Sequence, residues 1–234
     1  MDEFNMLEKG YKELQVQRRC GLRNVLARIE NIKDIIEHEC SEGLRDSTPF
    51  DTIKHRIKTF ESAYDKIGRK GWDESIESFK KMHDIAGIRI ITPYLSDVYD
   101  IREILYEQIE KTKPKNTMRI VHETDYIENP KENGYRSLHL DVEVKIAATK
   151  SSKAEWIPVE IQIRTKAMDL WASIEHKLKY KNPHPSHDTE AKLSDVADYL
   201  IGFDEMVMQL RDENDEEAIG LEDFSETQPL SNLP

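Results

Sequence analysis

Strict alternation of apolar and polar residues marks the strand around which the expected fold is built. In residues 156–165, WIPVEIQIRT, four apolar positions alternate with Pro158, Glu160, Gln162 and Arg164. A period of two indicates a strand with one buried and one polar face. For an isolated strand the simplest explanation of the polar face is solvation, with Glu160 and Arg164 forming an ion pair. A set of functional side chains is the alternative.

Four further segments have the character of strands, which predicts a sheet of about five. Residues 138–146 alternate most cleanly and would form an antiparallel hairpin with 156–165. Residues 85–92, IAGIRIIT, are almost continuously apolar, which is typical of a central strand covered on both sides. Residues 52–58 alternate between isoleucines and polar residues, mostly basic, and residues 118–125 are a weaker candidate.

Helical periodicity, in which apolar residues recur three or four positions apart, predicts helices on both sides of these segments. Thr59 is a plausible N-cap for one of them. The fold class that follows is α+β or mixed α/β, with a mixed sheet, helices on one face and a polar face left open. The expected helices are two within residues 1–40, one beginning near Thr59, and others at roughly 73–82, 98–109, 167–178 and 193–210.

Length and composition favour one core with helical additions. A chain of 234 residues can bury one good core but hardly two catalytic domains. Residues 1–48 are expected to form N-terminal helices, 49–182 the core, 183–211 a C-terminal helix, and 212–234 a disordered acidic tail. The sequence has no signal peptide and no apolar run of about 18 residues, and its two cysteines lack ligand-like spacing. A cytoplasmic protein with reduced thiols and no membrane part is therefore expected.

Charge is spread unevenly along the chain. Residues 204–226 hold ten acidic residues and one basic residue, a net charge of −9 out of −12 for the whole chain. Residues 54–70 hold six basic and two acidic residues, a net charge of +4. A local cationic segment on an acidic protein favours a small anionic ligand, since duplex binding usually needs a broad basic surface. No stable nucleic-acid partner is expected.

Several side chains of the expected polar face suit a nucleotide site. Asp84 and Glu160 are the pair of carboxylates that Mg²⁺ needs beside phosphate oxygens. Arg56 and Arg89 are flat cations that can stack on a purine, and Tyr135 can stack on a second base. The structural alternatives are an Asp84–Arg89 ion pair and a core position for Tyr135. A triphosphate would be bound by Lys58, Ser62, Lys66 and Arg69.

The motifs together resemble the synthetase domain of RelA/SpoT-type enzymes over roughly residues 50–181, and the length is similar to that of stand-alone small alarmone synthetases. The resemblance implies a nucleotidyltransferase-like fold and the transfer of pyrophosphate from ATP to the 3′-hydroxyl of GDP or GTP, which gives ppGpp or pppGpp. The motifs are HRIKTFESAYDKIGRK (55–70), DIAGIRI (84–90), KENGYRSLH (131–139), VEIQIRT (159–165) and WASIEHKLKYK (171–181).

The same resemblance implies a role for each candidate residue. Arg56 and Arg89 would sandwich the adenine, and Asp84 and Glu160 would bind Mg²⁺. Glu160 would also orient or deprotonate the 3′-hydroxyl. The ATP phosphates would be held by Lys58, Ser62, Lys66 and Arg69. The guanine would be bound by Tyr135, with polar contacts from Lys131, Asn133, His139, Gln162 and Arg164.

Comparison with other members of the family bears on regulation and assembly. Long members carry an N-terminal hydrolase domain and C-terminal regulatory domains, and this chain has room for neither, so synthesis without hydrolysis is expected. Some small members form tetramers with an alarmone in a central cleft. A homo-oligomer is expected here too, although the residues before Arg56 and the residue Asp169 lack the pattern of that cleft. The preference between GDP and GTP stays open.

Two rival functions are weighed against this one. An HD-type phosphohydrolase is suggested by His83-Asp84 and His187-Asp188, but the first pair leads into a strand and the second lies in a proline-rich loop, whereas that class presents its metal ligands from helices. A non-catalytic nucleotide-binding or RNA-binding module is the other rival. Two carboxylates among cations would not help a protein that only binds anions.

Overall fold

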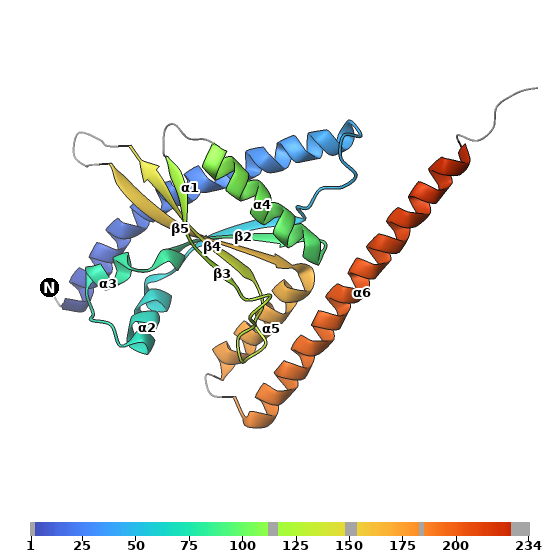
Figure 1. The fold of residues 1–234 in the computed structure, drawn as a ribbon. Helices are drawn as coiled ribbons and strands as arrows, with labels where there is room; N and C mark the ends of the chain where they lie inside the picture. The colour runs from blue at the N-terminus through green and yellow to red at the C-terminus, as the bar shows by residue number, and fades with distance from the viewer. Residues whose placement is uncertain (1–2, 112–116, 148–153, 183–184, 226–234) are drawn as a thin grey trace, which may run out of the picture.

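The computed structural model describes residues 3–111, 117–147, 154–182 and 185–225. It contains one five-stranded mixed sheet with the strand order β1-β2-β5-β4-β3, with helices along it and beyond its edges (Figure 1). The strands are Thr52–Ile57 (β1), Ala86–Thr92 (β2), Met118–Asp125 (β3), Leu138–Ile146 (β4) and Glu155–Thr165 (β5). The helices are Glu3–Ser41 (α1), Phe60–Lys70 (α2), Ile76–Lys80 (α3), Leu95–Lys111 (α4), Lys166–Lys181 (α5) and His187–Ser225 (α6), and a 3-10 turn (η1) covers His83–Ile85.

β5 is the central strand, and burial confirms its predicted apolar face, although Pro158 and Arg164 of the opposite face are buried as well. β4 pairs with it antiparallel, as expected of a hairpin, and β2 pairs with it parallel on the other side. β2 differs from its prediction because Gly87 and Arg89 are half-buried, so that both faces are covered only in its C-terminal half. The four alternating aliphatic residues of β5 are at most 4% exposed: Ile157, Val159, Ile161 and Ile163.

The apolar face of the sheet is covered by α1 and α4, which confirms that these helices share one face. Val25 and Ile29 of α1 and Val98 and Ile101 of α4 are fully buried in one cluster with the strand residues. Each buried aliphatic side chain of this size contributes about 1.5–3 kcal/mol relative to an exposed one. The opposite face of the sheet, which carries the polar residues of each strand, is left to α5 at one end and to the site described below.

α1 is one continuous helix of 39 residues, so the prediction of two helices within residues 1–40 was wrong. The helix contributes residues to two hydrophobic cores, one after the other along its length, and its backbone is continuous between them. Leu22 and later residues pack on the sheet, whereas Tyr11 and Leu14 belong to a second core. The remaining buried residues of that second core are Phe60, Ala63, Ile67, Phe79, Met82 and Ile85.

The second core fixes α2, which carries several of the candidate residues. The Tyr11 hydroxyl donates a hydrogen bond to the Lys58 carbonyl at 2.9 Å, at the end of β1. Thr59 is the N-cap of α2, as predicted, and its side chain accepts a hydrogen bond from the Ser62 amide at 3.3 Å. Gly71 closes the helix in the left-handed conformation, with a φ of 62°.

α6 spans His187–Ser225, which is longer than the predicted helix at 193–210. Residues 212–225 were expected to belong to a disordered tail, but they continue the helix, because glutamate, alanine and leucine in this segment have high helix propensity. Residues 226–234 lie outside the described part. Figure 1 shows the C-terminal half of α6 extending well past the sheet. Across the described ranges, every helix is too short or too polar to span a membrane.

The N-terminal half of α6 supports the loop that precedes β4. The indole Nε1 of Trp171 donates to the Leu193 carbonyl at 3.1 Å, and the Thr165 hydroxyl donates to Asp204 at 2.9 Å, which ties α6 to α5 and β5. Gly134 of the loop has a φ of +83°, and a Cβ built there would lie 2.6 Å from the Cβ of Ala197 in α6. Glycine therefore lets the loop turn and lets α6 approach it closely.

We expect Gly134→Ala to lower the free energy of unfolding by roughly 2–4 kcal/mol, from backbone strain and the clash with Ala197 together. Gly43→Ala is a matched control, because Gly43 has a φ of +69° but a Cβ at that position would meet no described atom within 4 Å. It should cost only about 1–2 kcal/mol. Urea unfolding of both variants measures the difference, and equal losses would contradict the close contact.

Candidate functional site

The polar face of β1, β2, β5 and β4 brings the candidate residues together. The strand register places Gly87 beside Arg56 on one side and beside Glu160 on the other. Across β5, His139 of β4 pairs with Gln162. A cavity of about 210 Å³ opens at this face, and five of the residues chosen from the sequence line it. The lining residues are Lys54, His55, Arg56, Asp84, Gly87, Ile88, Arg89, Glu160 and Gln162.

Asp84 is placed by η1, directly before β2, and its two carboxylate oxygens have different surroundings. Its Oδ2 accepts hydrogen bonds from the ammonium groups of Lys58 and Lys66, the latter at 2.9 Å. Its Oδ1 is buried without a hydrogen-bond partner among the described residues. Burial alone would raise the pKa of Asp84, but the two lysines outweigh it and hold the pKa below its usual value. Asp84 is therefore ionised at neutral pH with one oxygen available for a ligand.

Glu160 is held by two neighbours on the same face. Its Oε1 lies 3.2 Å from Nδ1 of His139, and its Oε2 accepts a hydrogen bond from Gln162 at 2.6 Å. Burial acts to raise the pKa of Glu160. The hydrogen bond and the charge of His139 act in the opposite direction, and the resulting pKa lies below its usual value. The charge of Asp84 also acts on Glu160, as expected of two carboxylates that share one pocket.

Arg164 lies deeper than the alternation in the sequence suggested. Its side chain is 1% exposed, and the simple ion pair with Glu160 is not formed. Instead its Nη2 donates to the Tyr135 hydroxyl at 3.0 Å and to the side-chain carbonyl oxygen of Gln162. Its Nη1 lies 3.7 Å from Asp169. Arg164 thus lies behind the residues that face the pocket and supports them.

Tyr135 lies at the end of the loop before β4 and is half-buried, so it is not the fully buried core residue of the structural alternative. Its hydroxyl lies 2.8 Å from Nε2 of His139. The ammonium of Lys131 lies 4.6 Å from the centre of its ring, and Asn133 bonds Glu175 of α5 at 3.2 Å. Burial raises the pKa of Tyr135, which therefore stays protonated and can donate. The loop brings three candidate residues to the edge of the site.

The cationic residues form a patch next to the carboxylates, and they differ in how exposed they are to solvent. Lys58 is 11% exposed and Lys66 is 27% exposed, and both converge on Asp84. Burial lowers the pKa of Lys58, although its contact with Asp84 opposes the shift. Ser62 and Arg69 are exposed on the same side of α2 as Lys66, because these positions are spaced by four and three residues.

Asp169 lies behind the cavity lining, where it contacts Arg89 and Lys54, and the sequence assigned it no role at the nucleotide site. It lies in the first turn of α5, where an acidic residue already has an ordinary explanation in the helix dipole. In the structure its Oδ1 accepts a hydrogen bond from Nη1 of Arg89 at 2.9 Å. The alternative of an Asp84–Arg89 ion pair was therefore wrong, since each residue pairs elsewhere. Only the fold shows that α5 starts beside Arg89.

The residues that prompted the phosphohydrolase hypothesis lie apart along the fold. His83 and Asp84 belong to η1, and His187 and Asp188 form the exposed first turn of α6. Within residues that the structure describes, no three His, Cys, Asp or Glu side chains are grouped so that they could hold a metal ion.

Comparison with known proteins agrees with the geometry. "GTP pyrophosphokinase YwaC" of Bacillus subtilis is 41% identical over 170 residues, which cover 71% of this chain and 76% of that protein. The structure of small alarmone synthetase 1 from Bacillus subtilis bound to its product pppGpp superposes with a TM-score of 0.76 at 30% identity, over 88% of this chain and 98% of that one. The same synthetase bound to AMPCPP gives a TM-score of 0.71 at 28% identity, over 89% and 99% of the two chains.

The family model agrees with the motifs. The model described as "Region found in RelA / SpoT proteins" matches residues 55–185, a span that runs from within β1 through α5 and includes every residue that the sequence assigned to the nucleotide site. The TM-scores show that the solved synthetases share the fold of this chain. The chain belongs to the RelA/SpoT family.

Proposed function

We propose that this chain is a (p)ppGpp synthetase, which transfers pyrophosphate from ATP to the 3′-hydroxyl of GDP or GTP. The observation that carries the proposal is a pair of ionised carboxylates, Asp84 and Glu160, in one cavity with Arg56 and Arg89. The relatives support it, because one is named a GTP pyrophosphokinase and another was solved with pppGpp and with AMPCPP.

The carboxylates fit a hard divalent cation. Oδ1 of Asp84 is buried and has no hydrogen-bond partner in the part of the chain that the structure describes, which is a costly arrangement unless a ligand binds there. Mg²⁺ is the cation of choice, and when bound by Asp84 and Glu160 it would neutralise phosphate charge and align the triphosphate. Lys58 and Lys66 would then interact with both Asp84 and the phosphates. Ser62 and Arg69 of α2 would make further contacts with the phosphates.

The two nucleotides would occupy neighbouring parts of the polar face. Arg56 and Arg89 line the cavity from β1 and β2 and would stack on the adenine from either side. Tyr135 would stack on the guanine, with Lys131, Asn133, His139 and Gln162 nearby. Arg164 would act through Tyr135 and Gln162, which it already contacts.

Glu160 would orient the acceptor hydroxyl and accept its proton. Pyrophosphate transfer forms a bond from the 3′-oxygen to the β-phosphorus of ATP and breaks the bond to the oxygen that leaves with AMP. The hydroxyl proton must go to a base, and an ionised carboxylate within the site can accept it. His139 and Gln162 each hold one oxygen of Glu160 and so fix its orientation.

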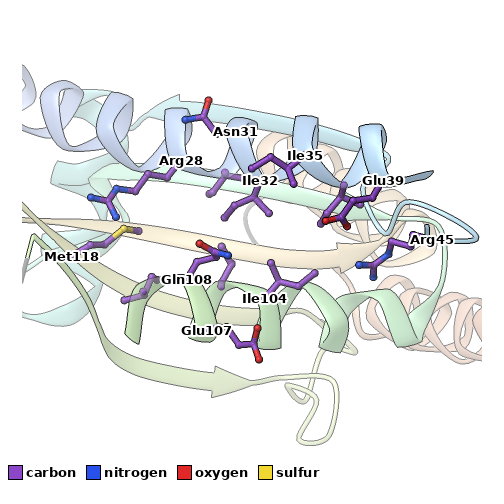
Figure 2. A pocket seen from close by; sticks show the side chains of 14 residues that line it. Arg28, Asn31, Ile32, Ile35, Glu39, Arg45, Ile104, Glu107, Gln108 and Met118 are labelled. Atoms are coloured by element: carbon purple, nitrogen blue, oxygen red, sulfur yellow. The ribbon is translucent and has the colours of Figure 1, made fainter. Parts of the chain in front are cut away.

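A homo-oligomer is the assembly that the surface favours. α6 exposes a row of large apolar side chains, including Tyr199 at 79% and Met206 at 61%. A groove of about 440 Å³ lies between α1 and α4, with Ile32, Ile35 and Ile104 along it and Arg28 and Arg45 at its ends (Figure 2). Apolar surface of this kind is typical of contact with another protein. Light scattering of the purified chain measures the assembly directly.

The proposed activity is tested by incubating the chain with ATP, Mg²⁺ and GDP or GTP and separating the nucleotides. Equal amounts of AMP and ppGpp, or pppGpp, are expected. ATP and GTP binding without AMP release would instead support a non-catalytic nucleotide-binding module. Comparing GDP with GTP in the same assay gives the acceptor preference.

We expect Glu160→Gln to lower turnover by roughly 10²- to 10⁴-fold, because glutamine keeps the size but loses the charge and basicity. ATP affinity should fall less than the rate, since the lysines of the phosphate patch remain. Glu143→Gln is the matched control. Glu143 lies beyond His139 in β4, pairs with Arg119 at 2.5 Å and does not line the cavity. An active but destabilised Glu160→Gln protein would refute the catalytic role.

Tyr135→Ala should weaken acceptor binding by about 1–3 kcal/mol, the range for a base stacked on an aromatic ring. ATP binding should hardly change, because the adenine is assigned to Arg56 and Arg89. Tyr135→Phe keeps the ring and loses the hydroxyl contacts with His139 and Arg164, so it should retain most acceptor affinity. Titration of each nucleotide measures both effects, and equal loss for both would mean that Tyr135 supports the fold.

A further inference from the structure

Asp169 gathers cations from three different strands. Its Oδ1 accepts a hydrogen bond from Nη1 of Arg89 in β2 at 2.9 Å. Its Oδ2 accepts one from Nζ of Lys54 in β1 at 3.0 Å, and Nη1 of Arg164 in β5 lies 3.7 Å away. The Asp169 side chain is 12% exposed, so these contacts are screened less than a surface ion pair would be.

The contact with Arg89 has a geometric consequence for a ligand in the cavity. The side chain of Arg89 is 28% exposed, and its Nε is buried without a hydrogen-bond partner in the described ranges. Asp169 binds the guanidinium at its edge, which leaves the flat face of the group available for stacking. An arginine held in this way loses less side-chain entropy when a flat ring binds against it.

The same carboxylate reaches toward the acceptor side. Arg164, beside Asp169, donates to the hydroxyl of Tyr135 at 3.0 Å. That hydroxyl lies 2.8 Å from His139, which in turn lies 3.2 Å from Glu160. The hydrogen bonds that Asp169 accepts come from Arg89 and Lys54, which both line the cavity, so its main effect is expected on the donor nucleotide.

We propose that Asp169 is a positioning residue for ATP, which holds the guanidinium of Arg89 in the plane required for stacking on the adenine. The proposal rests on the proposed function through the assignment of Arg56 and Arg89 to the adenine. Asp169 touches neither the reacting phosphorus nor the acceptor hydroxyl in this arrangement. Its loss should therefore affect ATP binding and leave the chemical step nearly unchanged.

The test compares Asp169→Ala with Asp169→Glu and a matched control. Asp169→Ala should raise the KM and the Kd for ATP about tenfold, the change that corresponds to one charge-assisted hydrogen bond. The kcat and the KM for the acceptor should stay close to the parent values. Asp169→Glu, which keeps the charge, should restore part of the ATP affinity. Asp51→Ala is the control, because Asp51 also pairs with the first turn of α5, through Lys166 at 2.6 Å, but its side-chain partners Lys166 and Thr52 lie outside the cavity lining.

A double-mutant cycle separates positioning from general support of the fold. If Asp169 acts through Arg89, Asp169→Ala should cause little further loss of ATP affinity in an Arg89→Ala background. Additive losses would overturn the proposal. So would an Asp169→Ala variant with a lowered melting temperature that weakens ATP and GDP binding alike. ATP binding is measured by calorimetry without acceptor, so the result stands apart from the synthesis assay: a parent chain that binds ATP but makes no ppGpp refutes the proposed function, not the role of Asp169.

Discussion

The parallel pairing of β2 with β5 is the constraint on which the site depends. A parallel pair needs a long crossover connection, and here that connection contains α4, β3 and β4. Because the register sets Gly87 beside Glu160, the turn that precedes β2 delivers Asp84 to the same end of the sheet. A shift of one residue would turn every polar side chain of β5 into the core, and the buried isoleucines of that strand make such a shift costly.

Each partly buried carboxylate of the site has a cationic or hydrogen-bonding partner that stabilises its charge. Each carboxylate is partly desolvated, which would raise its pKa, yet each keeps its charge because a specific partner outweighs the burial. Asp84 has its lysines and Glu160 has His139. The second core contributes to this arrangement. Tyr11 and its neighbours fix the start of α2 and therefore the direction from which Lys66 reaches Asp84.

The sequence predicted those features that follow from local pattern. The five strands, the hairpin of β4 with β5, the N-cap Thr59 and the pair Asp84 and Glu160 all come from periodicity and residue chemistry. The partners of these residues could not be predicted, because they depend on how elements distant in sequence pack. Asp169 reaches Arg89 across 80 residues of chain. Arg164 fits the polar alternation of β5, but its burial arises from Tyr135 and α5, which cover it.

Helix boundaries failed for a different physical reason. Periodicity indicates which face of a helix is apolar. It does not indicate whether different parts of that face pack against different cores. α1 passes from the second core to the sheet as one helix, and α6 continues through an acidic segment in which no apolar periodicity was recognised. Both lengths depend on what surrounds the helix.

The bare backbone at Gly87 has a consequence for how the cavity would accept a flat ring. Gly87 lines the cavity between Arg56 and Glu160, and a Cβ there would come no closer than 4.0 Å to Arg56. The floor of the cavity is thus peptide, and its shape is set by the spacing of hydrogen-bonded strands, about 4.8 Å. Under the proposed function, Arg56 and Arg89 would therefore do most of the adjusting to a bound base, because a strand backbone held by its sheet hydrogen bonds moves less than an arginine side chain.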